Sequence, residues 1–209
     1  MTYGLVSIII PKACPEDKDM TLAEVSLAAQ DYPTKEFFVE LDEKHEGAPA
    51  ARNRGWKKAS GEFLLFSDCD CLWQPTALSK LVAALRSDPL ASYAYCAMEA
   101  VGCGYLIDKG VVRTLCMGPF TPEDVLKSSK ISTMSLFRAA GFPGFDESIK
   151  RLQDWDLYLT LLERDKRLGV CVPEVLFRTA ARAGITYGLK QPISCEAAYE
   201  IIQRKHGLL

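Results

Sequence analysis

The sequence predicts an α/β domain in which a mainly parallel sheet is flanked by helices. Two observations lead to this prediction. Short β-branched and aromatic runs alternate with segments whose apolar residues recur at helical spacing, and such alternation indicates right-handed crossovers between parallel strands. Two aspartates also follow the third predicted strand directly, at the sheet edge where open α/β sheets bind ligands.

The first half of the chain alternates regularly. The predicted strands are LVSIII (5–10), EFFVEL (36–41) and FLLF (63–66), and the predicted helices cover residues 19–30, 48–59 and 75–86. Asp19 is the expected cap of the first helix, and Pro75 opens the third.

The second half is less regular. The predicted strands are 91–98, 104–108, 131–137 and 170–177, and the predicted helices are 121–129, 153–165 and 195–206. Glycine and proline in residues 141–148 predict a loop. Because no linker or repeat interrupts the chain, we expect residues 1–209 to form one domain.

Composition narrows the function classes. The net charge of −2 over 209 residues argues against a nucleic-acid-binding protein, which carries a basic excess. The longest apolar run, Leu5–Ile10, is too short to cross a bilayer, and the N-terminus lacks the features of a signal peptide. Eight scattered cysteines without a CxxC pair indicate reduced thiols, so we expect a cytoplasmic protein.

Asp68 and Asp70 stand at the end of an apolar run, in GEFLLFSDCDCLWQP (61–75). Charge is expensive to keep at the end of a buried strand, so a cation is expected there. Two carboxylates two positions apart can both reach one Mg²⁺ or Mn²⁺ ion, which prefers oxygen ligands. The alternative is that they are turn aspartates that bind nearby backbone amides.

The segment GAPAARNRGWKKASGEFLLFSDCD (47–70) resembles the central part of the family 2 glycosyltransferases, in which an Ala-Arg-Asn-x-Gly helix precedes Gly-Glu, an apolar strand and Asp-x-Asp. SIIIP (7–11) and QDYPTKEFFV (30–39) are similar to the preceding part of that family. Residues 135–162, with Phe-Asp-Glu at 145–147 and Gln-Asp before an amphipathic helix, resemble its acceptor-side region.

The resemblance covers roughly residues 5–180. It implies a GT-A-type, Rossmann-like fold with a nucleotide-sugar-binding half (1–98) and an acceptor-side half (99–209). The implied enzyme moves a sugar from a nucleotide-sugar donor to a hydroxyl acceptor, with inversion and with help from Mn²⁺ or Mg²⁺. The family's Gln-x-x-Arg-Trp motif of polymer synthases is missing, which favours single transfers.

The resemblance also assigns roles to residues. Asp68 and Asp70 are implied as metal ligands that neutralise the leaving diphosphate, and Asp154 as the base that activates the acceptor. Trp155 is implied on the acceptor side. The remaining nucleotide-sugar contacts are expected at Pro11, Glu40, Asp42 and Arg52.

Each role has an alternative. Asp154 could be a first-turn carboxylate stabilised by the helix dipole, and Trp155 could be a core residue. Arg52 could contact the diphosphate, hold an aspartate of the Asp-x-Asp, or be a solvated helix arginine. His206 is a further metal ligand if the C-terminal tail folds back.

The sequence departs from the family after two strands. VELDEKHEG (39–47) replaces the usual Asp-Asp-Gly-Ser-like turn, which leaves the nucleotide base open, and Arg178 and Arg182 stand near the usual late histidine. An inactive binding module is therefore one alternative function. A nucleotidyltransferase is another, although residues 11–19 contain no glycine to cradle a triphosphate. A homodimer is compatible with each of these functions.

Overall fold

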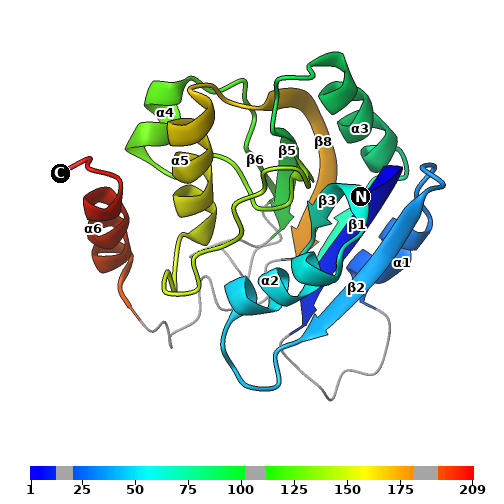
Figure 1. Ribbon diagram of the computed structural model, residues 1–209, viewed down its shortest axis with the longest axis horizontal. Coiled ribbons are helices and arrows are strands. Elements are labelled where there is room, and N and C mark those ends of the chain that lie inside the picture. The colour runs from blue at the N-terminus through cyan, green and yellow to red at the C-terminus, as the bar shows by residue number, and fades with distance from the viewer. Residues whose placement is uncertain (13–20, 102–111, 181–192) are drawn as a thin grey trace.

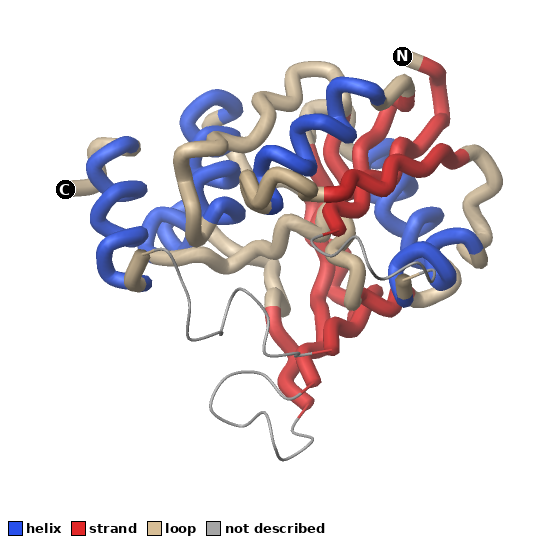
Figure 2. Tube along the Cα trace, turned by 90° about the horizontal axis from the view of Figure 1, so that it is seen from below, coloured by secondary structure: helices blue, strands red, loops and turns tan. Residues whose placement is uncertain are grey.

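The computed structural model describes residues 1–12, 21–101, 112–180 and 193–209. Strands and helices form three layers, with the sheet in the middle and helices on both of its faces (Figures 1 and 2). The strands are β1 Thr2–Lys12, β2 Lys35–Leu41, β3 Gly61–Phe66, β4 Cys71–Trp73, β5 Tyr93–Val101, β6 Val112–Leu115, β7 Leu136–Arg138 and β8 Val170–Ala180. The helices are α1 Leu22–Ala28, α2 Ala48–Lys58, α3 Ala77–Ser87, α4 Pro122–Lys127, α5 Gln153–Asp165 and α6 Cys195–Lys205.

The sheet confirms the α/β prediction and adds a detail. Its order is β2-β1-β3-β7-β5-β8-β4, and β6 pairs with β5. Three pairs of neighbours are parallel: β2 with β1, β1 with β3, and β5 with β8. The other pairs are antiparallel: β7 with β3 and β5, β4 with β8, and β6 with β5. The five longest strands therefore point the same way and end at one edge, while three short strands run against them and make the sheet mixed.

Side chains of the central strands fill two cores, one on each face of the sheet. Ile8 and Ile10 of β1 face the core under α1 and α3, whereas Ile9 faces the core under α2, α4, α5 and α6. Phe63 and Leu64 of β3 are divided between the two cores in the same way. Burial on both faces explains why these strands are apolar without alternation.

Most elements agree with the sequence predictions in both halves, apart from shifts of a few residues at their ends. Helix α5 covers 153–165 as predicted, and the predicted strand at 131–137 is reduced to β7. The first helix begins later than predicted, because Thr21 and Glu24 form a capping box; the expected cap Asp19 lies outside the described residues, as does the predicted strand 104–108. Strands β4 and β6 were not predicted.

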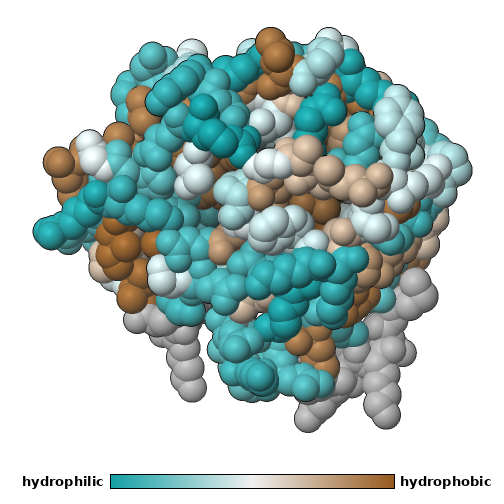
Figure 3. All heavy atoms as spheres, viewed as in Figure 1, coloured by the Kyte–Doolittle hydropathy of each residue, from teal (hydrophilic) through white to brown (hydrophobic). Residues whose placement is uncertain are grey.

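The described surface shown in Figure 3 is mostly hydrophilic, and hydrophobic side chains lie on it in separate patches. Among the described helices, none is long and apolar enough to span a membrane. The two ends of the chain lie far apart, with the N-terminus at β1 and the C-terminus beside α6 (Figure 1).

Candidate functional site

The acidic turn lies where β3 ends, at the edge that the five longest strands share. Trp73 fixes the start of this turn, because its indole N–H donates to the hydroxyl of buried Ser67 at 2.8 Å. The Asp68 side chain is 41% exposed, so it can reach a ligand. The Asp70 carboxylate accepts a hydrogen bond from Thr179 of β8 at 3.3 Å. The turn thus lies beside the carboxyl end of β8 as well as that of β3.

Arg52 of α2 binds the acidic turn. The exposed fraction of the whole residue is 4%, and its Nη2 lies 2.6 Å from Oδ1 of Asp68. Its Nη1 donates to Oε1 of Gln153, the first residue of α5, at 3.2 Å. Arg52 is therefore not a solvated helix arginine, and it connects the end of β3 with the beginning of α5.

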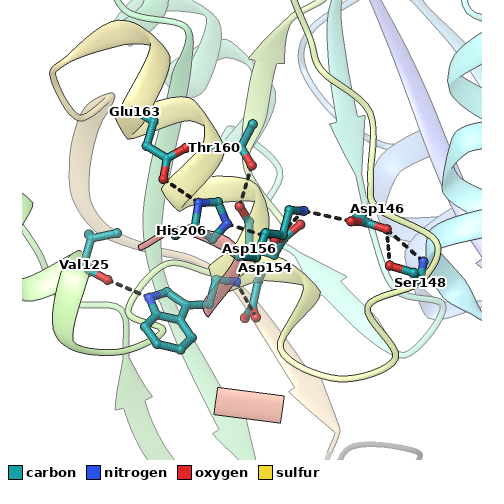
Figure 4. A network of polar contacts seen from close by, with 10 residues as sticks. Val125, Asp146, Ser148, Asp154, Asp156, Thr160, Glu163 and His206 are labelled. Carbon is teal, nitrogen blue, oxygen red and sulfur yellow. Dashed lines mark hydrogen bonds and ion pairs between the residues drawn. The ribbon is translucent and has the colours of Figure 1, made fainter. Parts of the chain in front are cut away.

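Asp154 lies in the first turn of α5. The backbone N–H of Trp155 donates to its Oδ1 at 2.8 Å (Figure 4), and the preceding Leu152 has a left-handed conformation with φ 59°. Burial raises the pKa of Asp154, while hydrogen bonds from the Trp155 amide and the Ser129 side chain act against this rise. The charge of Arg52 also lowers this pKa. Arg52 contacts both Asp68 and Gln153, so the acidic turn and the residue that directly precedes Asp154 lie at one guanidinium.

Helix α2 is held close to the sheet and to the loop before α5. A Cβ at Gly55 would lie 2.5 Å from Cγ2 of Ile9 in β1, so only glycine allows this approach. Asn53 donates to the carbonyl of Phe145 at 2.9 Å and accepts from its N–H at 2.9 Å. In the Ala-Arg-Asn-x-Gly sequence, Asn53 and Gly55 therefore pack α2 against its neighbours, while Arg52 binds the acidic turn.

Glu40 and Asp42 lie at the carboxyl end of β2, and the carboxylates of both already bind other groups of the protein. Glu40 forms an ion pair with Lys58 at 2.7 Å. The two carboxylate oxygens of Asp42 accept from the N–H groups of Glu46 and Gly47 at 2.9 and 2.7 Å. A nucleotide base would have to share these carboxylates with their present partners.

Two further residues singled out in the sequence, Pro11 and Arg178, lie among the described residues. Pro11 lies near the end of β1, where it pairs in register with Glu40. Arg178 of β8 forms an ion pair with Glu99 of β5 at 2.5 Å. Arg182 lies outside the described residues.

Trp155 corrects the expectation of an acceptor contact. Its exposed fraction is 0%. The centroid of its ring lies 4.7 Å from that of the Tyr199 ring, and its indole N–H donates to the carbonyl of Val125 at 2.6 Å. Stacking on a sugar needs an exposed ring face, so Trp155 is a core residue that joins α4, α5 and α6.

His206 does not reach the acidic turn. It follows α6 and lies between Asp156 and Glu163 of α5 (Figure 4), with ring nitrogens 3.0 and 2.6 Å from their carboxylate oxygens. Lys205 adds ion pairs with Asp156 and Asp146 at 2.7 and 2.8 Å. These contacts attach α6 to α5, so His206 is not the further metal ligand considered from the sequence.

Three residues contact the candidate site but were given no role in the sequence analysis. Gln153, Ser129 and Thr179 contact Arg52, Asp154 and Asp70 respectively. Gln153 alone carried a usable signal, because it precedes Asp154 directly. The other two are brought in by strand pairing and by the loop after α4.

These features define a class of protein: an α/β fold of the GT-A type, with an acidic turn at the shared strand edge facing the start of a helix. The model of the family described as "Glycosyl transferase family 2" matches residues 16–146. The chain belongs to this family.

One sequence relative and two solved structures are similar to this chain, and the solved structures show that it shares their fold. An uncharacterized glycosyltransferase of Haemophilus influenzae is 26% identical over 133 residues, which are 58% of this chain and 43% of the relative. The structure of S. aureus TarS residues 1–349 in complex with UDP-GlcNAc has a TM-score of 0.72 at 21% identity, covering 97% of this chain and 65% of that TarS chain. A Pyrobaculum calidifontis mannosyltransferase with GDP-Man and Mn²⁺ has a TM-score of 0.55 at 17% identity, covering 97% of this chain and 61% of the other. The chain thus spans less than two thirds of each of these three proteins.

Proposed function

We propose that this protein transfers a sugar from a nucleotide-sugar donor to a hydroxyl acceptor, with inversion at the anomeric carbon. The observation that supports the proposal most is that Arg52 contacts both Asp68 and Gln153, and Gln153 directly precedes Asp154. The leaving diphosphate and the acceptor hydroxyl need opposite assistance, a positive charge for one and a proton acceptor for the other. The two structural relatives bound to UDP-GlcNAc and GDP-Man support the choice of donor class.

Asp68 and Asp70 fit a divalent cation that keeps open positions. No three acidic, histidine or cysteine side chains of the described residues are grouped as a complete metal site. Two carboxylates suit Mg²⁺ or Mn²⁺ when substrate phosphates and water supply the other ligands. Such a cation would neutralise charge on the diphosphate, and the mannosyltransferase relative holds Mn²⁺.

Nucleotide binding tests this proposal. UDP or GDP with MnCl₂ should raise the melting temperature, because a ligand at 100 times its Kd stabilises the folded state by about 2.7 kcal/mol, which is roughly 5–10 °C for a chain of this size. Asp70→Ala should abolish the shift. Asp31→Ala is the matched control, because Asp31 is exposed and lies in the turn before β2. If neither nucleotide shifts the wild-type melting temperature, the proposal is wrong.

An inactive binding module is the second candidate, and the engagement of Glu40 and Asp42 favours it. Both candidates bind a nucleotide, so binding alone does not separate them. Slow hydrolysis of UDP-GlcNAc or GDP-Man does, since a transferase can pass its sugar to water. Release of nucleotide by wild type, lost in Asp154→Asn, supports the enzyme; binding without release supports the module.

A further inference from the structure

One buried guanidinium lies between the two ends of the proposed site. Arg52 donates through one terminal nitrogen to Asp68, at 2.6 Å, and through the other to Gln153, at 3.2 Å. These partners come from different halves of the chain. Asp68 follows β3 at the donor side, and Gln153 is the residue before Asp154.

The helix that carries Arg52 has little freedom to move. Gly55 lets α2 lie against Ile9 of β1, and the neighbouring Asn53 binds both backbone groups of Phe145. The Phe145 ring also lies next to the guanidinium, whose central carbon is 5.4 Å from the ring centroid. The position of the guanidinium is therefore set by β1 and by the loop before α5.

A buried arginine at position 52 destabilises the folded state more than an apolar side chain would. Nε of Arg52 is buried and has no hydrogen-bond partner among the residues that the structure describes, and an unsatisfied buried donor destabilises the folded state. An apolar side chain of similar size would fill the same space without this cost. However, an apolar side chain could not form the hydrogen bonds by which Arg52 links Asp68 to Gln153.

We propose that Arg52 is a positioning residue that holds the acidic turn after β3 and the start of α5 at a fixed separation. The role rests on the proposed function, in which Asp68 serves the donor and Asp154 the acceptor. A planar guanidinium can hold two partners in a defined geometry, which the single ammonium of a lysine cannot do. Gln153 completes the connection on the α5 side.

A fixed separation matters because transfer requires donor and acceptor to be aligned. A misplacement of about 1 Å can lower a rate by about 10²-fold. In this role Arg52 takes no part in bond making. Loss of Arg52 should therefore lower turnover much more than it lowers nucleotide affinity.

Hydrogen exchange of the ligand-free protein tests the connection without any substrate. In Arg52→Gln, exchange should rise several-fold in two segments together, residues 66–71 and 150–156. In Gln153→Ala it should rise in the second segment only. Lys57→Gln is the matched control, because Lys57 is an exposed cation of the same helix, and it should change neither segment. A rise in only one segment of Arg52→Gln, or in neither, would overturn the proposal.

Kinetics then tests the role in transfer. With UDP or GDP and Mn²⁺, nucleotide affinity of Arg52→Lys should stay near that of wild type, while donor hydrolysis falls by about 10²-fold. In Arg52→Ala, millimolar guanidinium chloride should restore part of the hydrolysis, because the ion fits the vacated space. Equal losses of affinity and turnover without rescue would reduce Arg52 to a stabilising residue. If wild type binds no nucleotide, the proposed function fails, whereas the exchange result still decides whether Arg52 connects the two segments.

Discussion

At the scale of single residues, Asp154 combines a stability cost with a proposed catalytic role. Burial raises its pKa above the ordinary value for aspartate. A raised carboxyl pKa means that the folded state binds a proton more tightly than the unfolded state, so stability falls as pH rises from the unfolded to the folded pKa. The folded state therefore favours protonated Asp154, whereas the proposed role as base needs the ionised form.

Asp154→Asn separates the two effects. Asparagine still accepts the Trp155 N–H but carries no charge, so the melting temperature at pH 7 should be equal to or higher than that of wild type. Turnover should fall by about 10²–10⁴-fold because the base is lost, while the nucleotide-induced thermal shift stays. Wild-type turnover should decline as pH falls through the raised pKa. An active Asp154→Asn protein would remove Asp154 from the role of base.

The sequence predicted site residues where the signal was local. Asp68 and Asp70 follow directly on an apolar strand, so their place at the sheet edge could be derived from the strand alone. The burial of Arg52 could not, because its partner Gln153 is 101 positions away. Trp155 was ambiguous because it shares a helical face with Leu159 and Leu162, and that face proved to be the core.

At the scale of elements, short antiparallel strands were the hardest to predict. Strands β4 and β6 have 3 and 4 residues and exist through their pairing with β8 and β5. The predicted strand at 131–137 is shortened because Ser135 bonds back to Thr133 through its N–H, at 2.8 Å, and to Ser132 through its hydroxyl, at 2.9 Å. Pairing and local side-chain bonds therefore override β-propensity here.

Docking of α6 on α5 should depend on pH. Burial alone would lower the pKa of His206, but hydrogen bonds to Asp156 and Glu163 outweigh it, and the pKa of His206 is raised. A raised histidine pKa stabilises the folded state fully below about pH 6.5, its unfolded value, and this contribution is lost as pH rises through the folded pKa. Lys205 and Asp146 face the same cluster; they keep their charges in this window, because the pKa of Lys205 is raised and that of Asp146 lowered to about 2.

Hydrogen exchange of residues 195–206 measures this docking. After correction for intrinsic exchange rates, protection of α6 should fall as pH rises through the folded pKa of His206. In His206→Gln the protection should be lower and should not change with pH in that window. Protection that depends on pH equally in both proteins would show that another group controls α6.

At the scale of the whole molecule, the two halves inferred from the sequence share both cores. Leu136 and Phe177 lie in the core that contains Ile8 and Phe63. On the other face, Ile9 and Leu64 share a core with residues of α4, α5 and α6. The sheet is interleaved as well, because β7 from the second half lies between β3 and β5. Neither half can bury its apolar surface alone.

The chain should therefore unfold in one step. Thermal unfolding followed by far-ultraviolet circular dichroism and by tryptophan fluorescence should give coincident transitions, since Trp56, Trp73 and Trp155 sample both cores. A fragment of residues 1–98 should show no cooperative transition, because β3 loses its partner β7 and β5 loses β6, β7 and β8. Separate transitions, or a fragment that melts cooperatively, would mean that residues 1–98 form a domain in their own right.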